Sequence, residues 1–218
     1  MEMNDTLILK KITHVYYTKR GDRRSIFNNV NLSIKKGETV TILGKSGYGK
    51  TTLANIICGY LEPTNGNVFV NGLNTNSPSK ERVMVNQSDD LFDWMSIEEN
   101  MKIATKDVAK INRYLIAVNL INLKNEYPHK LSGGMRKKLS LARALAANPS
   151  ILVLDEPFSY LDHSTKSELF LFLSKNLKKA KTTTILITHD IDEAIYLSDR
   201  IFVLSNTGGG TLKEFLFK

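Results

Sequence analysis

GKSGYGKT at residues 44–51 lies between two apolar segments, TVTIL at 39–43 and LANIICGY at 53–60. The upstream segment has the composition of a buried strand, and the downstream one has helical spacing that stops near Gly59. Residues 44–51 fit the pattern G-x-x-x-x-G-K-[ST] in full. The chain therefore predicts a strand, a glycine-rich loop and a helix in direct succession, as in an α/β fold.

This loop has the residues needed to neutralise the phosphates of a nucleoside triphosphate. Its glycines allow backbone conformations closed to other residues, so that N–H groups point at phosphate oxygens, and the next helix adds its positive N-terminal end. The Lys50 ammonium can reach the β- and γ-phosphates, and the Thr51 hydroxyl suits Mg²⁺. Alone, the pattern leaves kinase, GTPase and ATPase open. The expected nucleotide-binding set is Gly44, Lys45, Ser46, Gly47, Tyr48, Gly49, Lys50, Thr51 and Thr52.

Two carboxylates follow another apolar run, in ILVLDEP at 151–157. An unbroken apolar run is typical of a strand covered on both faces, and ligands of open α/β sheets gather at the carboxyl ends of such strands. Asp155 can accept hydrogen bonds from Mg²⁺-bound water, and Glu156 can orient or deprotonate an attacking water molecule. A kinase would not need the second acid, so the pair favours hydrolysis.

A second helix start suited to anions occurs in LSGGM at 131–135. Ser132, Gly133 and Gly134 open an apparent helix, whose N-terminal end attracts negative charge. One chain does not need two γ-phosphate cradles. A head-to-tail dimer does, because each glycine-rich loop can then face the Ser-Gly-Gly of the other copy.

The 218 residues are 42% hydrophobic, which predicts one globular unit with a substantial core. No apolar run approaches the roughly 18 residues of a membrane-spanning helix, and the N-terminus is polar before it is apolar, unlike a secretory signal.

Cys58 is the single cysteine and is expected in the core. The charge of +8 is compatible with anionic lipid or with solubility, whereas scattered basic residues without an aromatic platform do not favour nucleic acid.

The remaining pattern divides the chain into an α/β part and a helical part. Strands are expected at 6–18 and 25–34 around the turn KRGDRR, and at 66–72 and 81–87. Between 88 and 148 the apolar residues recur only at helical spacing. Strand and helix patterns then alternate again: ILVLD, a helix over 164–180, TTTILITHD, IDEAIYLSD, RIFVLS, and a glycine turn before a short last element.

These motifs together resemble the ATP-binding subunits of ABC transporters over essentially the whole chain. In order they are the P-loop at 44–52, Gln87, LSGGM at 131–135, LVLDEP at 152–157, Ser159-Tyr160-Leu161-Asp162, and His189 in ITHD. The resemblance implies a single ABC nucleotide-binding domain over 1–218, with a P-loop NTPase (RecA-like) α/β core at 1–87 and 149–218, an antiparallel β subdomain, and an inserted α-helical subdomain at 88–148.

The resemblance also implies roles for single residues and for partners. Tyr16 would stack on adenine, with Tyr17 as the alternative. Gln87 would reach Mg²⁺ and the attacking water, and His189 would contact the γ-phosphate. Asp162 and the signature residues Ser132, Gly133, Gly134 and Met135 would act across a homodimer that encloses two MgATP. We expect the chain to sit on the cytoplasmic face of the cell membrane, as the peripheral partner of an integral membrane permease.

A narrower resemblance is to the nitrate, sulfonate and taurine importer branch, in YPHKLSGGM, DEPFSYLD and THDIDEAIYLSDR. It implies uptake of a small oxidised anion or related nutrient, delivered by an extracytoplasmic substrate-binding protein. Lys45, Tyr48, Asp93 and Tyr160 depart from the branch pattern. The alternatives are an ABC exporter subunit and a non-transport ABC ATPase acting on nucleic acid or ribosomes.

Overall fold

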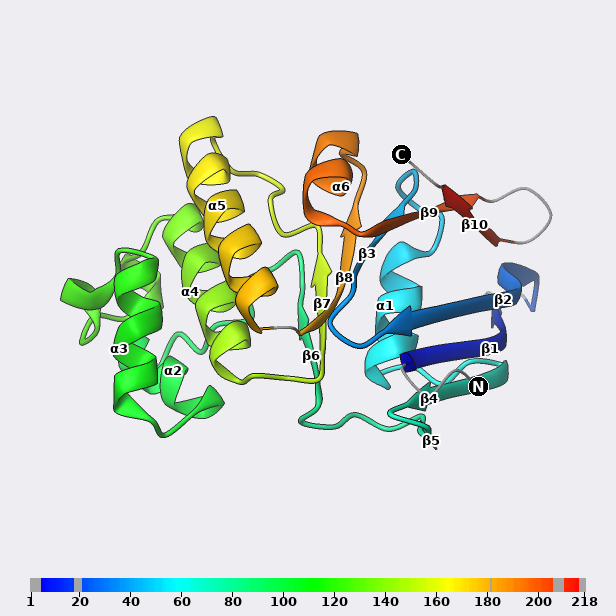
Figure 1. Cartoon of the computed structure of the whole chain (residues 1–218), viewed down its shortest axis with the longest axis horizontal. Helices are drawn as coiled ribbons and strands as arrows, with labels where there is room; N and C mark the ends of the chain where they lie inside the picture. The colour runs from blue at the N-terminus through cyan, green and yellow to red at the C-terminus, as the bar shows by residue number, and fades with distance from the viewer. Residues whose placement is uncertain (1–4, 18–20, 181, 206–209, 216–218) are drawn as a thin grey trace.

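The computed structural model describes residues 5–17, 21–180, 182–205 and 210–215, and shows two sheets with helices between and beside them (Figure 1). Predictions at Thr18, for part of the KRGDRR turn and for the glycine turn before the last element fall outside these residues. The remaining predicted strands and helices are confirmed, with boundaries that differ by one to a few residues. The α/β fold class predicted from the loop and its flanks is therefore confirmed.

The larger sheet has six strands in the order β10-β9-β3-β8-β7-β6. Its central strands run parallel, and only the edge strand β10 is antiparallel to its neighbour. The carboxyl ends of β3, β7 and β8 therefore meet at one edge of the sheet (Figure 1). The strands are β3 (Thr39–Leu43), β6 (Arg82–Val85), β7 (Ile151–Asp155), β8 (Thr183–Thr188), β9 (Arg200–Ser205) and β10 (Thr211–Phe215).

The smaller sheet is antiparallel, in the order β2-β1-β4-β5. Its two long strands form the predicted N-terminal pair, and the short β5 was not predicted because two exposed residues carry no periodic signal. Asn71 and Gly72 turn the chain between β4 and β5 with positive φ, which an Asn-Gly pair adopts readily. The strands are β1 (Asp5–Tyr17), β2 (Arg23–Lys35), β4 (Asn65–Val70) and β5 (Leu73–Asn74).

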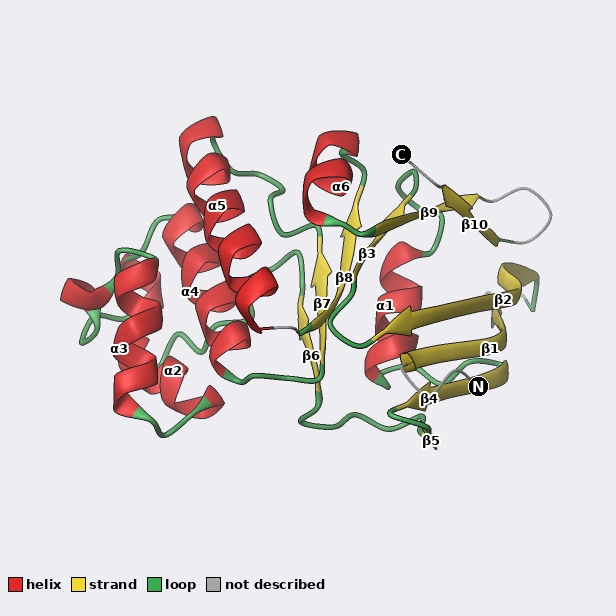
Figure 2. Ribbon diagram, viewed as in Figure 1, coloured by secondary structure: helices red, strands yellow, loops and turns green. Residues whose placement is uncertain are grey.

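The helices lie on both faces of the larger sheet (Figure 2). Helix α1 (Lys50–Cys58) fills the space between the two sheets, and α4 and α5 cover the opposite face of the larger one. Helix α6 (Ile191–Leu197) lies beside β3 and β8. The other helical elements are α2 (Ile97–Ala104), α3 (Val108–Ala117), the short 3-10 helices η1 (Ile121–Leu123) and η2 (Pro128–Lys130), α4 (Gly133–Ala146) and α5 (His163–Ala180).

The packing of strand β7 explains why its sequence is apolar at four successive positions. Ile151 and Val153 pack in the core that contains α1, whereas Leu152 and Leu154 pack in the core formed with α2–α5. Alternate residues of a strand point to opposite faces, so an apolar residue at every position serves two cores at once. Cys58 lies in the first core, and burial raises the pKa of its thiol to about 12, as expected for a structural cysteine.

The stretch between β6 and β7 is helical throughout its regular parts, and α2, α3 and α4 pack on one another. Helix α3 ends at Ala117. Asn119 takes a φ of 59°, and the Leu120 N–H donates to the Leu115 carbonyl, which closes the helix in a left-handed turn. The division of the chain at residues 88 and 148 remains a prediction. Within the described residues, no helix is both long and apolar enough to cross a membrane.

Candidate functional site

A cavity of about 480 Å³ opens at the edge where β3, β7 and β8 end. It brings together residues from seven of the predicted motifs and strands, which are far apart in the sequence. Its described lining is Tyr16, Arg24, Ile26, Ser46, Gly47, Gly49, Lys50, Thr51, Thr52, Gln87, Asp155, Glu156, Tyr160 and His189.

The loop before α1 needs its glycines. Gly47 and Gly49 have φ values of 80° and 99°, in the left-handed region that favours glycine. A Cβ atom on Gly49 would also lie 2.5 Å from Ile26 Cγ2, so the loop packs closely on β2. In the part of the chain that the structure describes, no side-chain hydrogen bond caps the start of α1. Unsatisfied N–H groups at a helix start are an anion-binding site, so the residues present fit a bound phosphate chain.

Lys50 lies over this loop, with a side chain only 7% exposed. Its Nζ donates to the Gly44 carbonyl at 2.8 Å and to the Lys45 carbonyl at 3.4 Å. Glu156 Oε1 lies 3.7 Å from the same ammonium. The cation is thus held at the mouth of the loop, where the end of a phosphate chain would lie.

Asp155 and Thr51 form an oxygen pair at the carboxyl end of β7. The Thr51 hydroxyl donates to Asp155 Oδ2 at 2.8 Å, and Asp155 is 4% exposed. Burial raises the pKa of Asp155, with a smaller contribution from the charge of Glu156, while the Thr51 hydrogen bond and the charges of Lys50 and Lys137 oppose it. Hydroxyl and carboxylate oxygens are the donors that Mg²⁺ prefers, so the pair fits that ion.

Glu156 and His189 contact each other directly. Glu156 Oε2 and His189 Nδ1 are 2.8 Å apart, and the Glu156 N–H donates to the Ile187 carbonyl at 2.9 Å. Glu156 has a φ of 50°, which turns its carboxylate out of β7 and into the cavity. A carboxylate held between an ammonium and an imidazole can orient water and accept its proton.

Tyr16, and not Tyr17, lines the cavity. Its hydroxyl is 3.5 Å from Thr52 Oγ1, and its ring is 43% exposed, whereas Tyr17 is 70% exposed. His14 packs edge-on against Tyr16, with ring centroids 4.7 Å apart. Among the described residues neither ring nitrogen of His14 has a hydrogen-bond partner, and burial lowers the pKa of its imidazole. The placement favours Tyr16 for the predicted aromatic contact.

Three residues of the predicted set do not line the cavity: Gly44, Lys45 and Tyr48. Gly44 and Lys45 shape the loop through their carbonyls, and Tyr48 packs against the core of α1. Conversely, Arg24 and Ile26 line the cavity and were not predicted as site residues. The only sequence signal of Ile26 was its place in the predicted strand 25–34, and that of Arg24 was its place in the predicted turn KRGDRR.

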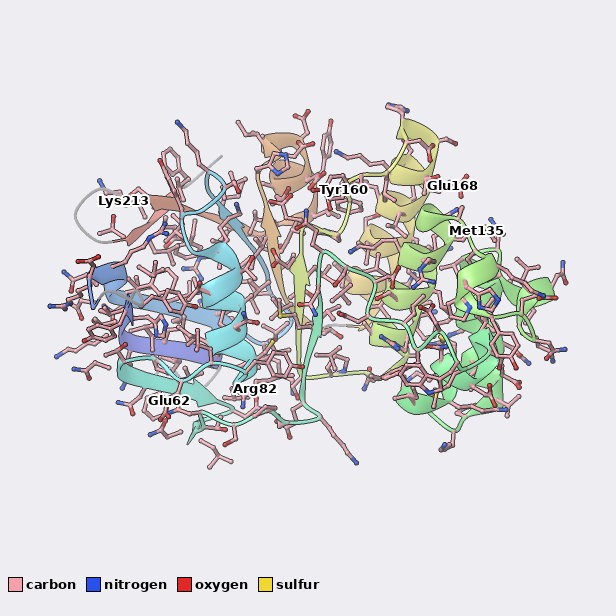
Figure 3. The ribbon with its side chains drawn as sticks, turned by 180° about the vertical axis from the view of Figure 1, so that it is seen from behind. Glu62, Arg82, Met135, Tyr160, Glu168 and Lys213 are labelled. Carbon is pink, nitrogen blue, oxygen red and sulfur yellow. The ribbon has the colours of Figure 1, made fainter. Side chains whose placement is uncertain are left out.

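The signature residues and Asp162 lie outside this cavity. Ser132 caps α4 by accepting from the Met135 N–H at 3.3 Å, and Asp162 accepts from the Thr165 N–H at 3.0 Å at the start of α5. Figure 3 shows Met135 on the side of the helical elements and Tyr160 nearer the strands. Each chain therefore has a second exposed helix start away from its own phosphate loop.

The start of α4 is nevertheless tied to the segment that carries Gln87. The Lys137 ammonium donates to the Asn86 carbonyl at 2.7 Å and to the Gln87 carbonyl at 3.1 Å. The Arg136 guanidinium pairs with Asp89 at 2.6 Å and with Asp93 at 2.8 Å. These contacts connect the cavity physically to the signature helix.

Comparison with known proteins identifies the family. Residues 27–159 match the family model of the ABC transporter domain. The chain is 40% identical to the uncharacterized ABC transporter ATP-binding protein YtlC of Bacillus subtilis, over 91% of this chain and 79% of that protein. It is 37% identical to the nitrate import ATP-binding protein NrtD of Synechococcus elongatus (91% and 76%) and 36% identical to the taurine import ATP-binding protein TauB of Pelagibacter ubique (96% and 82%).

A similar solved structure is the dimeric post-hydrolysis state of the ATP-binding cassette MJ0796 bound to ADP and Pi. It shares 29% identity with a TM-score of 0.84, covering 97% of this chain and 99% of that one. The cavity geometry, the family match and this likeness agree with one another. The chain thus belongs to the ABC transporter family and is an ATP-binding protein with ATPase activity.

Proposed function

We propose that this chain powers an ABC importer for a small oxidised anion, such as nitrate, a sulfonate or taurine, or for a related nutrient. The observation that carries the ATPase chemistry is the cluster of Lys50, Thr51–Asp155 and Glu156–His189 in one cavity. The direction of transport is supported by relatives whose names specify nitrate and taurine import. It is supported as well by the sequence likeness in the segments around the signature and His189.

In this proposal the loop residues bind the phosphate chain of ATP, with Lys50 on its β- and γ-oxygens. Tyr16 stacks on the adenine. Thr51 and Gln87 would hold a Mg²⁺ ion, with Asp155 accepting hydrogen bonds from its water; when bound, the ion neutralises charge on the phosphate oxygens. Binding separates Lys50 from Glu156, because the γ-phosphate needs the space between them.

Hydrolysis rests on Glu156 as general base. Water attacks the γ-phosphorus, its proton passes to the Glu156 carboxylate, and the bond to the bridging oxygen of ADP breaks. His189 positions Glu156 through their 2.8 Å contact and can turn toward the γ-phosphate, since its side chain is well exposed. Gln87, which also lines the cavity, helps to orient the water.

The signature helix start completes the site of a second copy. Ser132, Gly133 and Gly134 lie outside the cavity of their own chain, so a head-to-tail dimer gives each phosphate chain two helix starts. The dimeric arrangement of MJ0796 supports this assembly. Met135 lies in the first turn of α4 and Asp162 lies directly before α5. Both residues would contact the other copy.

The permease partner would dock on the segment from about residue 88 to 105. This segment follows Gln87, is held to α4 by Arg136, and exposes Trp94 at 72% and Ile103 at 52%. Exposed large apolar side chains of this kind mark protein contacts. Docking would keep the ATPase at the cytoplasmic face of the cell membrane, and an extracytoplasmic binding protein would deliver the substrate to the permease.

The test is affinity purification of the tagged protein from detergent-solubilised membranes, with mass spectrometry of the copurifying proteins. A multi-span permease together with an extracytoplasmic binding protein supports the importer, and that binding protein can then be screened with oxidised anions. A permease without any binding protein favours an exporter. Ribosomal or DNA-associated partners without a membrane protein would contradict transport and leave the ATPase intact.

A further inference from the structure

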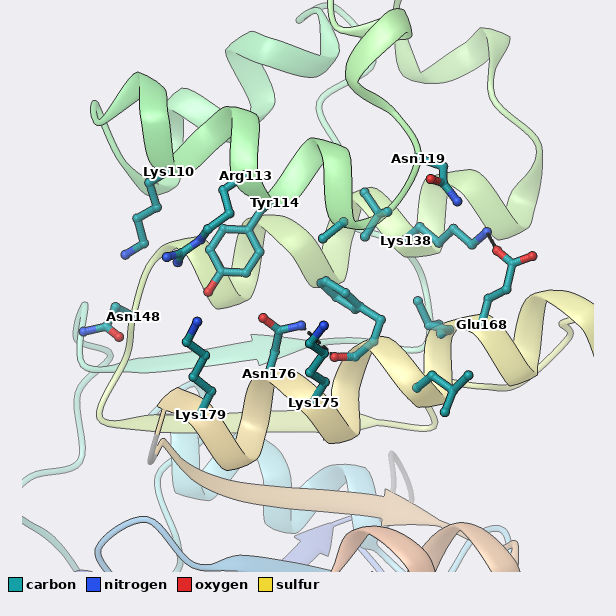
Figure 4. Close-up of a pocket in the computed structure, with 15 residues that line it drawn as sticks. Lys110, Arg113, Tyr114, Asn119, Lys138, Asn148, Glu168, Lys175, Asn176 and Lys179 are labelled. Carbon is teal, nitrogen blue, oxygen red and sulfur yellow. Dashed lines mark hydrogen bonds and ion pairs between the residues drawn. The ribbon is translucent and has the colours of Figure 1, made fainter.

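A second, larger cavity of about 700 Å³ lies between α3, α4 and α5, away from the nucleotide cavity. Figure 4 shows Lys110, Arg113 and Tyr114 reaching into it from α3, opposite Lys175 and Lys179 on α5. None of its lining residues belongs to the predicted motifs or to the nucleotide cavity. Cavities of roughly 300–1,000 Å³ are the size used for small-molecule ligands.

The charge in this groove is unbalanced. Among the described residues, five basic side chains line it, and Glu168 is the single carboxylate. That carboxylate pairs with Lys138 from α4. The other four cations have no acidic partner among the described residues. They are Lys110, Arg113, Lys175 and Lys179.

Helix electrostatics do not account for this cluster. Lys175 and Lys179 lie in the last turns of α5, where the negative helix end favours cations. Lys110, however, lies in the first turn of α3, where the helix end is positive and a cation is unfavourable. Facing cations repel one another across the groove. A bound anion would offset both the repulsion between the facing cations and the unfavourable position of Lys110 at the positive start of α3.

The floor of the groove is apolar and buried. Tyr114, Val118, Leu169 and Phe172 line it with little exposure, and the Arg113 guanidinium lies 5.0 Å from the centre of the Tyr114 ring. The amides of Asn148 and Asn176 stand beside the cations and offer additional hydrogen bonds (Figure 4). The groove thus combines a hydrophobic floor with a rim of donors.

We propose that this groove binds a multiply charged, phosphate-bearing ligand, whose phosphates lie between α3 and α5 and whose less polar part rests on Tyr114 and Phe172. Arginine and lysine donors facing each other suit phosphate oxygens, and the aromatic floor suits a ring or a short carbon chain. Such a ligand can come from solution, as a phosphorylated metabolite, or from a membrane, as an anionic lipid headgroup. Because it would contact both helices, its binding would hold α3 against α5.

The experiment compares a groove variant with a control of equal charge change. The groove variant is Arg113→Gln/Lys175→Gln/Lys179→Gln, and the control is Lys36→Gln/Lys80→Gln/Lys213→Gln, whose lysines are exposed elsewhere. Binding of inorganic tripolyphosphate is measured by titration calorimetry at physiological salt in the presence of saturating ADP. ADP occupies the P-loop, so any remaining binding there is the same in the parental protein, the groove variant and the control variant. Circular dichroism verifies that each variant is folded.

In solution, we expect the groove variant to lower tripolyphosphate affinity about tenfold or more and the control variant by less than about twofold. Flotation with phosphatidylglycerol vesicles, against phosphatidylcholine vesicles, tests the lipid source in the same three proteins. Loss of flotation in the groove variant alone supports the lipid source, whereas loss of tripolyphosphate binding alone supports the soluble one. Equal losses in both variants, or no loss in either assay, would overturn the proposal. ATPase activity is a separate readout, because no groove residue lines the nucleotide cavity.

Discussion

The starts of α1 and α4 are both glycine-rich, yet only one of them lies in a complete pocket. The start of α1 is surrounded within its own chain by Lys50, Asp155, Glu156 and His189. The start of α4 has its Ser132 cap, and none of the signature residues lines either of the two cavities described above. The start of α1 thus lies beside side chains that can bind phosphate and accept a proton, whereas the start of α4 is an exposed helix end without such neighbours in its own chain.

In the proposed head-to-tail dimer, this difference would explain how one chain can bind ATP and still need a second copy for turnover. A helix start attracts anions, but it moves no proton and holds no metal by itself. The two starts are linked inside the chain by Arg136 and Lys137, which hold the Gln87 segment. The contacts of α4 therefore form a continuous physical link between the two helix starts.

The largest expected effect comes from removing the base at the α1 pocket. Glu156→Gln should lower the ATPase rate by about 100-fold or more, because the amide cannot accept the water proton. ATP affinity should stay within about twofold, since the phosphate loop is unchanged. Phosphate release and equilibrium ATP binding measure the two quantities. Glu62→Gln, an exposed glutamate outside the cavity, is the control, and full activity in Glu156→Gln would refute the general-base role.

The next effect comes from blocking the α4 start. Ser132→Arg should lower the ATPase rate by tens of fold while leaving ATP binding to the monomer unchanged, because Ser132 lies outside its own cavity. Loss of the helix cap should also reduce the free energy of unfolding by about 1 kcal/mol in urea. Ser79→Arg, at an exposed turn, controls for an added arginine.

Mixing two inactive variants sharpens this comparison. Equal amounts of Ser132→Arg and Lys50→Ala should recover roughly a quarter of the parental activity, because half of the dimers are mixed and each mixed dimer has one intact site. The mixture is assayed under conditions of subunit exchange. Absence of any recovery would contradict the head-to-tail arrangement.

A smaller effect is expected at the aromatic residue of the α1 pocket. Tyr16→Ala should weaken ATP binding about tenfold, through loss of stacking on the base. Tyr17→Ala should change it less than twofold, because Tyr17 does not line the cavity. Titration calorimetry with ATP compares the two, and Tyr16→Phe should retain most of the affinity. Equal losses of ATP affinity in Tyr16→Ala and Tyr17→Ala would contradict the stacking role proposed for Tyr16.

The smallest effect concerns the link between the two starts. The Arg136 hydrogen bond lowers the pKa of Asp89, with further contributions from the Leu91 N–H and nearby positive charges. A lowered folded-state pKa gives stability that is present at neutral pH and lost as pH falls through that pKa. Arg136→Gln should therefore cost about 1–2 kcal/mol of unfolding free energy at pH 7, and less near pH 3.

Urea unfolding at the two pH values measures this difference. Lys130→Gln, which breaks the exposed pair with Glu126, should cost less than about 0.5 kcal/mol at either pH. A pH-independent loss in Arg136→Gln would show that packing, and not the ion pair, holds the Gln87 segment to α4.

Much of the fold followed from local pattern. The unbroken run ILVLD predicted β7 with its observed bounds, and the helical spacing between residues 88 and 148 predicted α2, α3 and α4. The end of α3 did not follow from the pattern, because Asn119 closes the helix with a positive φ that periodicity does not reveal. Arg24 and Ile26 were missed because antiparallel pairing with β1, not any motif, brings β2 beside the phosphate loop.

By itself the sequence determined the phosphate loop, the hydrolytic carboxylates and the signature, since each needs particular residue types at fixed spacing along one strand or helix end. Only the tertiary structure places Tyr16, and not Tyr17, in the lining of the cavity. Neighbouring residues of a strand point to opposite faces, so the choice depends on which face of β1 is turned toward α1. The tertiary structure alone also places Lys110, Arg113, Lys175 and Lys179, from two helices, in one groove. Side chains some sixty residues apart share no local pattern, and meet only because α3 and α5 pack on the same side of the sheet.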